Sequence, residues 1–203
     1  MRHLLLHAQA WWDAQRFDQP LWQVVEWRDQ KVRHIQLHVA KALGKVVMAC
    51  GDEAAATSGS DAMAQVRDEV LPDIAIYRSQ LLHTFPDCGD PRAFPGGPPA
   101  GVAAWSVTAP RHGHTPGAEP LFPVVCRLGR SSAQLAAYLE PREHGAASPL
   151  SYIWGAIQDL HACAAVLATM FAVDLQRAHQ ARLEALLGTP LPALLVEASG
   201  DGR

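Results

Sequence analysis

The sequence predicts an all-α protein, a helical bundle in which two helical blocks are joined by a connector rich in proline and glycine. Apolar residues in both blocks recur at three- and four-residue steps, which is the period of an amphipathic helix. Apolar residues make up 49% of the 203 residues and charged residues 18%, so the chain holds enough apolar material for a folded core. The third observation is the crowding of prolines into one central stretch.

Three helices are predicted in the first block. The first covers residues 3–16, and the second covers about residues 22–50, with Gly51 at its end. The third covers about residues 62–84. Within it, Pro72 either kinks the helix or divides it in two, because proline lacks the backbone N–H and its ring clashes with the preceding turn.

The second block follows a connector that holds eight of the 15 prolines. Helical patterning resumes over about residues 124–139, is interrupted over residues 140–149, and returns from residue 151 to about 187. The predicted organisation is a first helical half (1–85), a connector (86–122), a second helical half (123–190) and a flexible tail (191–203).

The composition and charge of the chain indicate which partners and which cellular location to expect. A formal charge of −3 gives no general attraction to nucleic acid or to an anionic membrane. The N-terminus lacks the pattern of a signal peptide, and the longest apolar stretch, residues 162–173, is shorter than the ~20 residues that cross a bilayer. The four cysteines form no CxxC pair. We therefore expect a cytoplasmic protein with reduced thiols and no membrane contact.

The two helical blocks resemble each other. Aligning Gly44 with Gly129 places KALGKVVMA over CRLGRSSAQ and brings Asp73 opposite Asp159, with spacings that differ by one residue. This pattern indicates an internal duplication. The alternative is generic similarity between amphipathic helices, which share apolar residues at similar steps.

The order of these motifs, a helix with an internal glycine, a loop, and a helix with an aspartate before an apolar run, resembles the MazG-like all-α NTP pyrophosphatase superfamily. The resemblance covers about residues 22–85 and 124–188, and it includes Asp174 and Leu175 opening a last helix that ends in the basic stretch ARLE. It implies two pseudo-symmetric halves that reproduce within one chain the helix pairing of MazG-like dimers. The chain is then a monomer with pseudo-dimeric halves, or a homodimer.

In that family, the motifs Glu-Glu-x-Gly-Glu and Glu-x-x-Asp hold magnesium against a substrate triphosphate. Here the second motif keeps its aspartate as Asp73 and Asp159, and a one-residue register shift at Pro72 would bring Glu69 toward Asp73. The remaining glutamates are replaced. The corresponding residues are Lys41, Ala42, Lys45 and Val70 in the first block, and Cys126, Arg127, Arg130 and Ala156 in the second.

The basic replacements have two interpretations. Lys41 and Lys45 lie one helical turn apart, and together with the basic residues of the second block they present a cationic surface to a phosphate without metal. Alternatively, Lys41 or Lys45 pairs with Asp73, and Arg130 pairs with Asp159, which keeps the bundle core neutral. The proposed ligand-binding residues are His34, His38, Lys41, Lys45, Arg127 and Arg130.

His34 and His38 also share a helical face. Their spacing is that of a transition-metal pair, but no glutamate lies between them as in zinc peptidases. Because Lys41 follows on the same face, we expect an anion-binding or solvated histidine face rather than a metal site.

Three function classes follow. The leading hypothesis is a degenerate MazG-like protein without cofactor, which binds a nucleotide or phosphate or serves as a protein-interaction module. The enzyme alternative is a magnesium-dependent nucleoside triphosphate pyrophosphohydrolase that uses Asp73, Glu69 and Asp159. The third class is a structural subunit of a larger assembly, which predicts an exposed apolar face.

Overall fold

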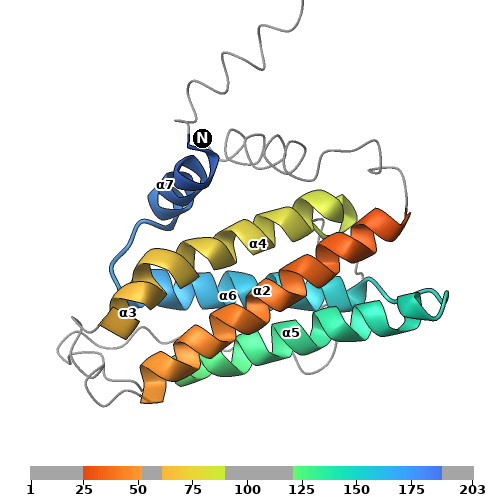
Figure 1. Cartoon of the computed structure of the whole chain (residues 1–203), viewed down its shortest axis with the longest axis horizontal. Helices are drawn as coiled ribbons and strands as arrows, with labels where there is room; N and C mark the ends of the chain where they lie inside the picture. The colour runs from red at the N-terminus through yellow and green to blue at the C-terminus, as the bar shows by residue number, and fades with distance from the viewer. Residues whose placement is uncertain (1–24, 52–60, 90–120, 189–203) are drawn as a thin grey trace, which may run out of the picture.

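The computed structural model describes residues 25–51, 61–89 and 121–188, and every regular element in these ranges is helical. The all-α class is therefore confirmed (Figure 1). The elements are α2 (Val25–Gly51), α3 (Asp61–Gln65), the π-helical turn η3 (Val66–Val70), α4 (Leu71–Thr84), the 3₁₀ turn η4 (Pro86–Gly89), α5 (Phe122–Glu143), α6 (Ser151–Met170) and α7 (Leu175–Leu187).

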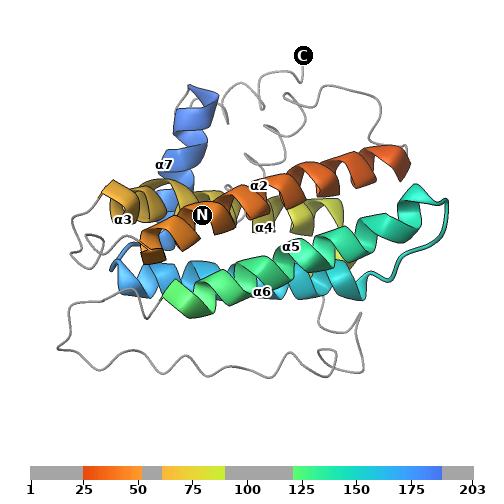
Figure 2. The same cartoon turned by 60° about the horizontal axis from the view of Figure 1, so that its bottom comes forward.

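Four long helices, α2, α4, α5 and α6, form the bundle, and α7 stands out from it beside α4 in both ribbon views (Figure 1, Figure 2). α5 packs against both α2 and α6, and α4 packs against both α6 and α7. By contrast, α2 and α4 meet over a much shorter stretch than α5 and α6. The core between the four helices is apolar, and its fully buried side chains include Ile35, Ile74, Leu128, Leu135 and Ile157.

Pro72 sits at the start of α4, directly after the π-helical turn η3. Proline offers no N–H to the carbonyl of Asp68 and its ring crowds that carbonyl, and a π turn relieves both problems by widening the helix by one residue. The predicted disturbance of the helix at Pro72 is confirmed. The same turn shifts the register of the residues before α4.

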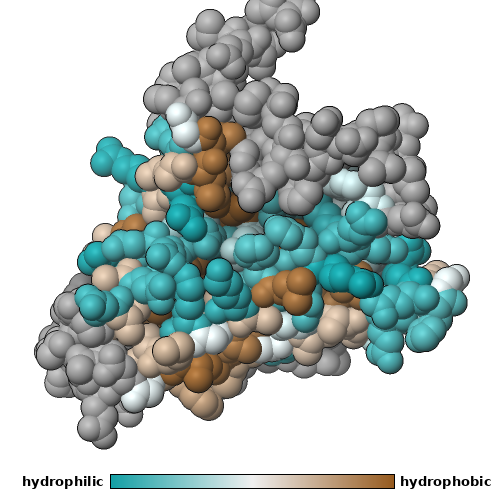
Figure 3. Space-filling view, viewed as in Figure 1, coloured by the Kyte–Doolittle hydropathy of each residue, from teal (hydrophilic) through white to brown (hydrophobic). Residues whose placement is uncertain are grey.

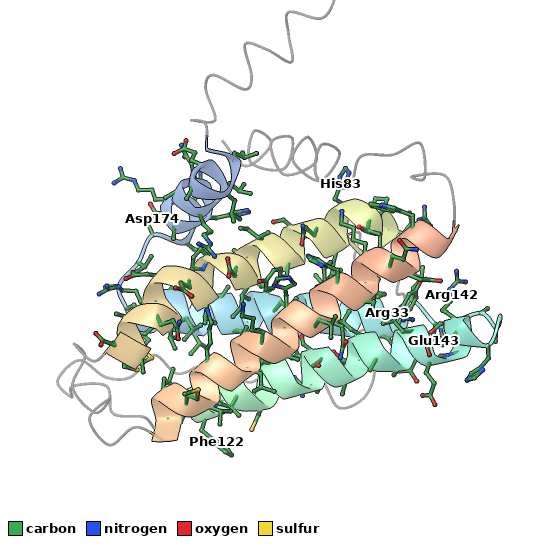
Figure 4. All side chains as sticks on the ribbon, viewed as in Figure 1. Arg33, His83, Phe122, Arg142, Glu143 and Asp174 are labelled. Atoms are coloured by element: carbon green, nitrogen blue, oxygen red, sulfur yellow. The ribbon has the colours of Figure 1, made fainter. Side chains whose placement is uncertain are left out.

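α5 extends beyond its predicted end and runs through Pro141 to Glu143. Contacts with α2 explain this extra turn. Arg142 donates from Nε to both carboxylate oxygens of Asp29, at 3.0 and 3.1 Å, and Arg33 pairs with Glu143 (Figure 4). These pairs offset the hydrogen bond that proline removes from the last turn.

The helical stretch predicted from residue 151 to 187 consists of two helices. α6 ends at Met170, and Ala172 takes a left-handed conformation with φ of 53°. Asp174 then caps α7, because its Oδ1 accepts hydrogen bonds from the backbone N–H groups of Gln176 and Arg177 at 3.0 and 3.2 Å. The start of a last helix at Leu175 agrees with the expectation from the family resemblance.

α6 is the one described helix that is long and apolar enough to cross a membrane by length and composition. Half of its apolar window is buried inside the bundle, where α6 packs between α4 and α5. The predicted helix over residues 3–16, most of the 86–122 connector and the 191–203 tail lie outside the described residues.

Candidate functional site

A cavity of about 270 Å³ lies between α2, the η3–α4 segment and α7. α2 and α4, which line it, meet over a short stretch compared with α5 and α6. Charged and ionisable side chains dominate its polar lining: His34, His38, Lys41, Lys45, Glu69, Asp73 and Arg182. Of the described residues, three basic residues, two acids and two histidines line the cavity.

The basic residues of α2 reach the cavity because of their spacing. His34, His38, Lys41 and Lys45 follow one another at steps of four, three and four residues, which keeps them on one face of a helix. The apolar residues between them, including Val39, point into the core. The helical period of α2 thus separates a buried apolar face from a polar face that lines the cavity.

Lys45 on α2 forms an ion pair with Glu69 at the end of η3. The hydrogen bond from Lys45 is the main reason why the pKa of Glu69 lies below its usual value. Glu69 enters the cavity together with Asp73, as the register shift at Pro72 predicts. The Glu69 carboxylate is already engaged by a cation.

Arg182 on α7 holds the second acid. Its Nε donates to Oδ1 of Asp73 at 2.8 Å and its Nη2 donates to Oδ2 at 3.3 Å. This two-pronged contact raises the pKa of Arg182 and ties α7 to α4. Both cavity acids are therefore paired with basic residues, one from α2 and one from α7.

Lys41 differs from the other two cations. It is exposed at the cavity and forms no ion pair or hydrogen bond with any residue that the structure describes. With Glu69 and Asp73 each balanced by a cation, the charge of Lys41 is uncompensated among the described residues. The cavity therefore has a net positive charge even when both histidines are neutral.

Tyr77 closes the floor of the cavity beside the histidines. Its hydroxyl lies 3.3 Å from Nδ1 of His38, and the rings of His34 and His38 are 4.4 Å apart. Burial, reinforced by the charge of Asp73, raises the pKa of Tyr77 far above its usual value. Tyr77 is consequently a neutral phenol at physiological pH.

Asp159 belongs to a separate cluster between α5 and α6. It is 1% exposed and accepts hydrogen bonds from Arg130, with Nε at 2.6 Å from Oδ2, and from Arg127, with Nη1 at 3.4 Å from Oδ1. Gly155 on α6 leaves room here for the side chain of Gln134 on α5, since a Cβ on Gly155 would lie 2.9 Å from Cδ of Gln134.

The structure thus brings together six of the nine residues singled out from the sequence: His34, His38, Lys41, Lys45, Glu69 and Asp73. Arg127, Arg130 and Asp159 do not line this cavity. Arg130 pairs with Asp159, as one interpretation expected, whereas Asp73 pairs with Arg182 instead of a lysine.

Arg182 and Tyr77 are the site residues that sequence reasoning missed. Arg182 lies in the ARLE stretch, which was noted only as part of the last helix. Within the described residues, no three His, Cys, Asp or Glu side chains form a metal-binding group, and all four cysteines are free thiols. Comparison of the chain with protein-family models, with curated proteins and with solved structures gives no match.

Proposed function

We propose that the chain is a degenerate MazG-like protein whose cavity between α2, α4 and α7 binds a nucleotide or another phosphate-bearing ligand without metal-dependent hydrolysis. The observation that supports this most is the uncompensated charge of Lys41 in a cavity that also holds Lys45 and Arg182. A site with excess positive charge and several N–H donors suits the oxygens of a phosphate.

Enough donors remain free for such a ligand. An ammonium group has three N–H donors and a guanidinium group has five. Lys45 uses one donor on Glu69, and Arg182 uses two on Asp73. The carboxylates therefore orient the two cations without exhausting them, and Lys41 contributes all of its donors.

The state of the acids supports binding without metal. Magnesium needs oxygen ligands in near-octahedral geometry, and it binds carboxylates most readily where their charge is not already balanced by a cation of the protein. Glu69 and Asp73 are instead held by Lys45 and Arg182. The cations on the protein occupy the positions in which a metal would neutralise these acids.

The MazG-like frame and its duplication are part of the proposal, with α2 and α4 in the first half and α5 and α6 in the second. The support for this relationship is that the aligned aspartates, Asp73 and Asp159, each accept from a guanidinium group, although Arg182 comes from α7 and Arg130 from α5. In the second half, Gly155 on α6 leaves room for the side chain of Gln134 on α5. A cytoplasmic location accords with the four free thiols.

The test combines calorimetric titration with a panel of nucleotides in EDTA and an assay of pyrophosphate release with magnesium. We expect binding in EDTA and no turnover. Lys41→Ala should weaken binding about ten- to hundredfold, since a hydrogen bond to a charged group contributes about 1.5–3 kcal/mol. Arg177→Gln is the control, because it removes one positive charge from an exposed position on α7 outside the cavity.

A magnesium-dependent nucleoside triphosphate pyrophosphohydrolase is the second candidate. One observation favours it: the π turn η3 places Glu69 in the same cavity as Asp73, which restores two acids of the family's second motif. Asp159 lies in the other cluster, so the reaction would depend on Asp73 and Glu69. Robust pyrophosphate release that Asp73→Ala abolishes would establish the enzyme and refute the first proposal.

A protein-interaction module or structural subunit is the third candidate. Its support is the exposure of large apolar side chains: Leu37 is 61% exposed, Met48 75% and Phe122 68%. Apolar surface appears where α2 ends and α5 begins (Figure 3), and Phe122 projects outward there (Figure 4). Light scattering after size exclusion tests this class. A monomer that binds no other protein would contradict it.

A further inference from the structure

We propose that the ligand of the α2–α4–α7 cavity is a small phosphate monoester rather than a triphosphate, and that His34 and His38 tighten its binding when they take up protons. This inference rests on the proposed function and specifies the chemistry of its ligand. It follows from the charge, the size and the histidines of the cavity.

The charge of the cavity sets the first limit. Lys45 balances Glu69 and Arg182 balances Asp73, so Lys41 alone provides the excess positive charge when the histidines are neutral. A phosphate monoester carries about −1.5 to −2 near pH 7. Lys41 together with one protonated histidine of the pair would match this charge. Two further phosphate groups without a metal would add negative charge that no remaining cation of the cavity balances.

The size of the cavity sets the second limit. Its volume of about 270 Å³ is below the ~300–1,000 Å³ of cavities that enclose drug-sized ligands. A phosphate group and the start of the molecule that bears it fit such a space. The rest of a larger ligand would extend beyond the cavity.

The two histidines provide variable charge. Histidine side chains change charge between about pH 5 and 8, and an imidazolium donates from both ring nitrogens. The neutral Tyr77 hydroxyl lies 3.3 Å from Nδ1 of His38 and can accept the proton there. Two imidazolium groups with ring centroids 4.4 Å apart repel each other, and a bound dianion reduces that repulsion. Ligand binding and proton uptake therefore favour each other.

The groups that surround the histidines leave this coupling intact. Both acids of the described lining are already held by cations, and its one remaining charged residue is Lys41. Among the described residues, the titratable and charged groups that line the cavity with the pair are Lys41 and Lys45 on α2, Glu69 on η3, Asp73 and Tyr77 on α4, and Arg182 on α7.

The experiment is metal-free calorimetric titration of the full chain at about pH 5.5 and about pH 7.5, on either side of the ordinary histidine range. The probes are sulfate, inorganic phosphate, a nucleoside monophosphate, a sugar phosphate and a nucleoside triphosphate. Sulfate stays a dianion at both pH values, so a change in its affinity reports on the protein. The nucleoside and sugar monophosphates distinguish the two sources of a phosphate monoester.

We expect the better monophosphate to bind at least about tenfold more tightly than the triphosphate, and sulfate to bind about tenfold more tightly at the lower pH. The double variant His34→Gln/His38→Gln should lose the pH dependence of sulfate binding, and each single variant should lose part of it. His144→Gln, at an exposed position after α5, should keep it.

The outcomes separate the two proposals. Tighter binding of the triphosphate in EDTA overturns the present inference and leaves the proposed function standing. An unchanged pH dependence of sulfate binding in both single variants and in the double variant also overturns it. If no probe binds at either pH, both the inference and the proposed function fail.

Discussion

Arg182 on α7 and Asp73 on α4 form a two-pronged ion pair, with Nε 2.8 Å from Oδ1 and Nη2 3.3 Å from Oδ2. The pair joins two elements that are 109 residues apart in sequence and closes one side of the cavity. Among the described residues, α7 also buries His179 and Leu183, and its Leu175 and Leu187 pack, partly buried, against the core. Arg182 adds to this packing the ion pair that ties α7 to α4.

Replacing Arg182 should loosen α7. We expect Arg182→Gln to lower the free energy of unfolding by about 1–3 kcal/mol, because it leaves a half-buried carboxylate without its charged donors. Hydrogen exchange should become faster in α7 and stay unchanged in α5. Arg177→Gln on the same helix should cost less than about 0.5 kcal/mol, since its contact with Asp174 is exposed. Equal effects of the two variants would contradict this account of α7.

The Asp159 cluster should contribute more to stability than the Asp73 pair. Asp159 is 1% exposed and pairs with both Arg130 and the largely buried Arg127 between α5 and α6. Removing one member of a buried ion pair costs about 3–5 kcal/mol, so Asp159→Ala should be the more destabilising variant in urea unfolding. Asp73→Ala should cost about 1–3 kcal/mol, because Arg182 can turn toward solvent. The reverse order would show that the Asp159 cluster is not a structural core.

His179 should make the protein sensitive to acid. Burial, together with the charge of Arg78, lowers the pKa of His179 to about 4. In the native state, His179 therefore binds a proton less readily than in the unfolded state, in which a histidine titrates near pH 6.5. Stability falls as the pH drops from about 6.5 to about 4, by about 3 kcal/mol over that window.

His179→Leu tests this directly. In urea unfolding across the same pH range, the variant should lack the fall in stability that His179 causes. Leucine fills the buried site without titrating. His144→Gln is the matched control, because His144 is exposed and its replacement should leave the slope unchanged. A parallel decline in wild type and His179→Leu would contradict the burial of a neutral imidazole at this position.

The close approach of α5 and α6 at Gly155 can be tested with a double-mutant cycle. A Cβ at residue 155 would collide with the side chain of Gln134. Glycine inside a helix costs about 1 kcal/mol relative to alanine. Gly155→Ala should therefore stabilise by about that amount in a Gln134→Ala background and gain less, or nothing, in the wild-type background. The same gain in both backgrounds would contradict this coupling and show that the Gln134 side chain moves aside without cost.

The sequence predicts much of the fold because local period and local chemistry determine it. The helices at α2, α4, α5 and α6 follow from their apolar spacing, and Asp174 is a sound start signal for α7. The extension of α5 through Pro141 depends instead on Asp29 and Arg33, which lie on another helix. Such tertiary contacts override local signals and leave no trace in the local pattern.

The candidate site, like the fold, can be predicted from the sequence only in part. The steps between His34, His38, Lys41 and Lys45 place these residues on one face of α2, so their convergence can be predicted from sequence. The partner of Asp73 cannot, because Arg182 reaches it only after the chain turns at Ala172 and sends α7 back across α4. The basic residue that pairs with Asp73 depends on the direction of that turn, and no local sequence pattern encodes this direction.

The most direct test of phosphate binding in the cavity uses the lysines. The chain has three, Lys31, Lys41 and Lys45, so nitrogen NMR of the ammonium groups gives three signals. Lys31 is buried against the ring of Trp27, 4.9 Å from its centroid, and serves as an internal control. On titration with a nucleoside monophosphate in EDTA, the signals of Lys41 and Lys45 should shift and saturate together while that of Lys31 stays in place. An unchanged Lys41 signal at saturating ligand would contradict the account.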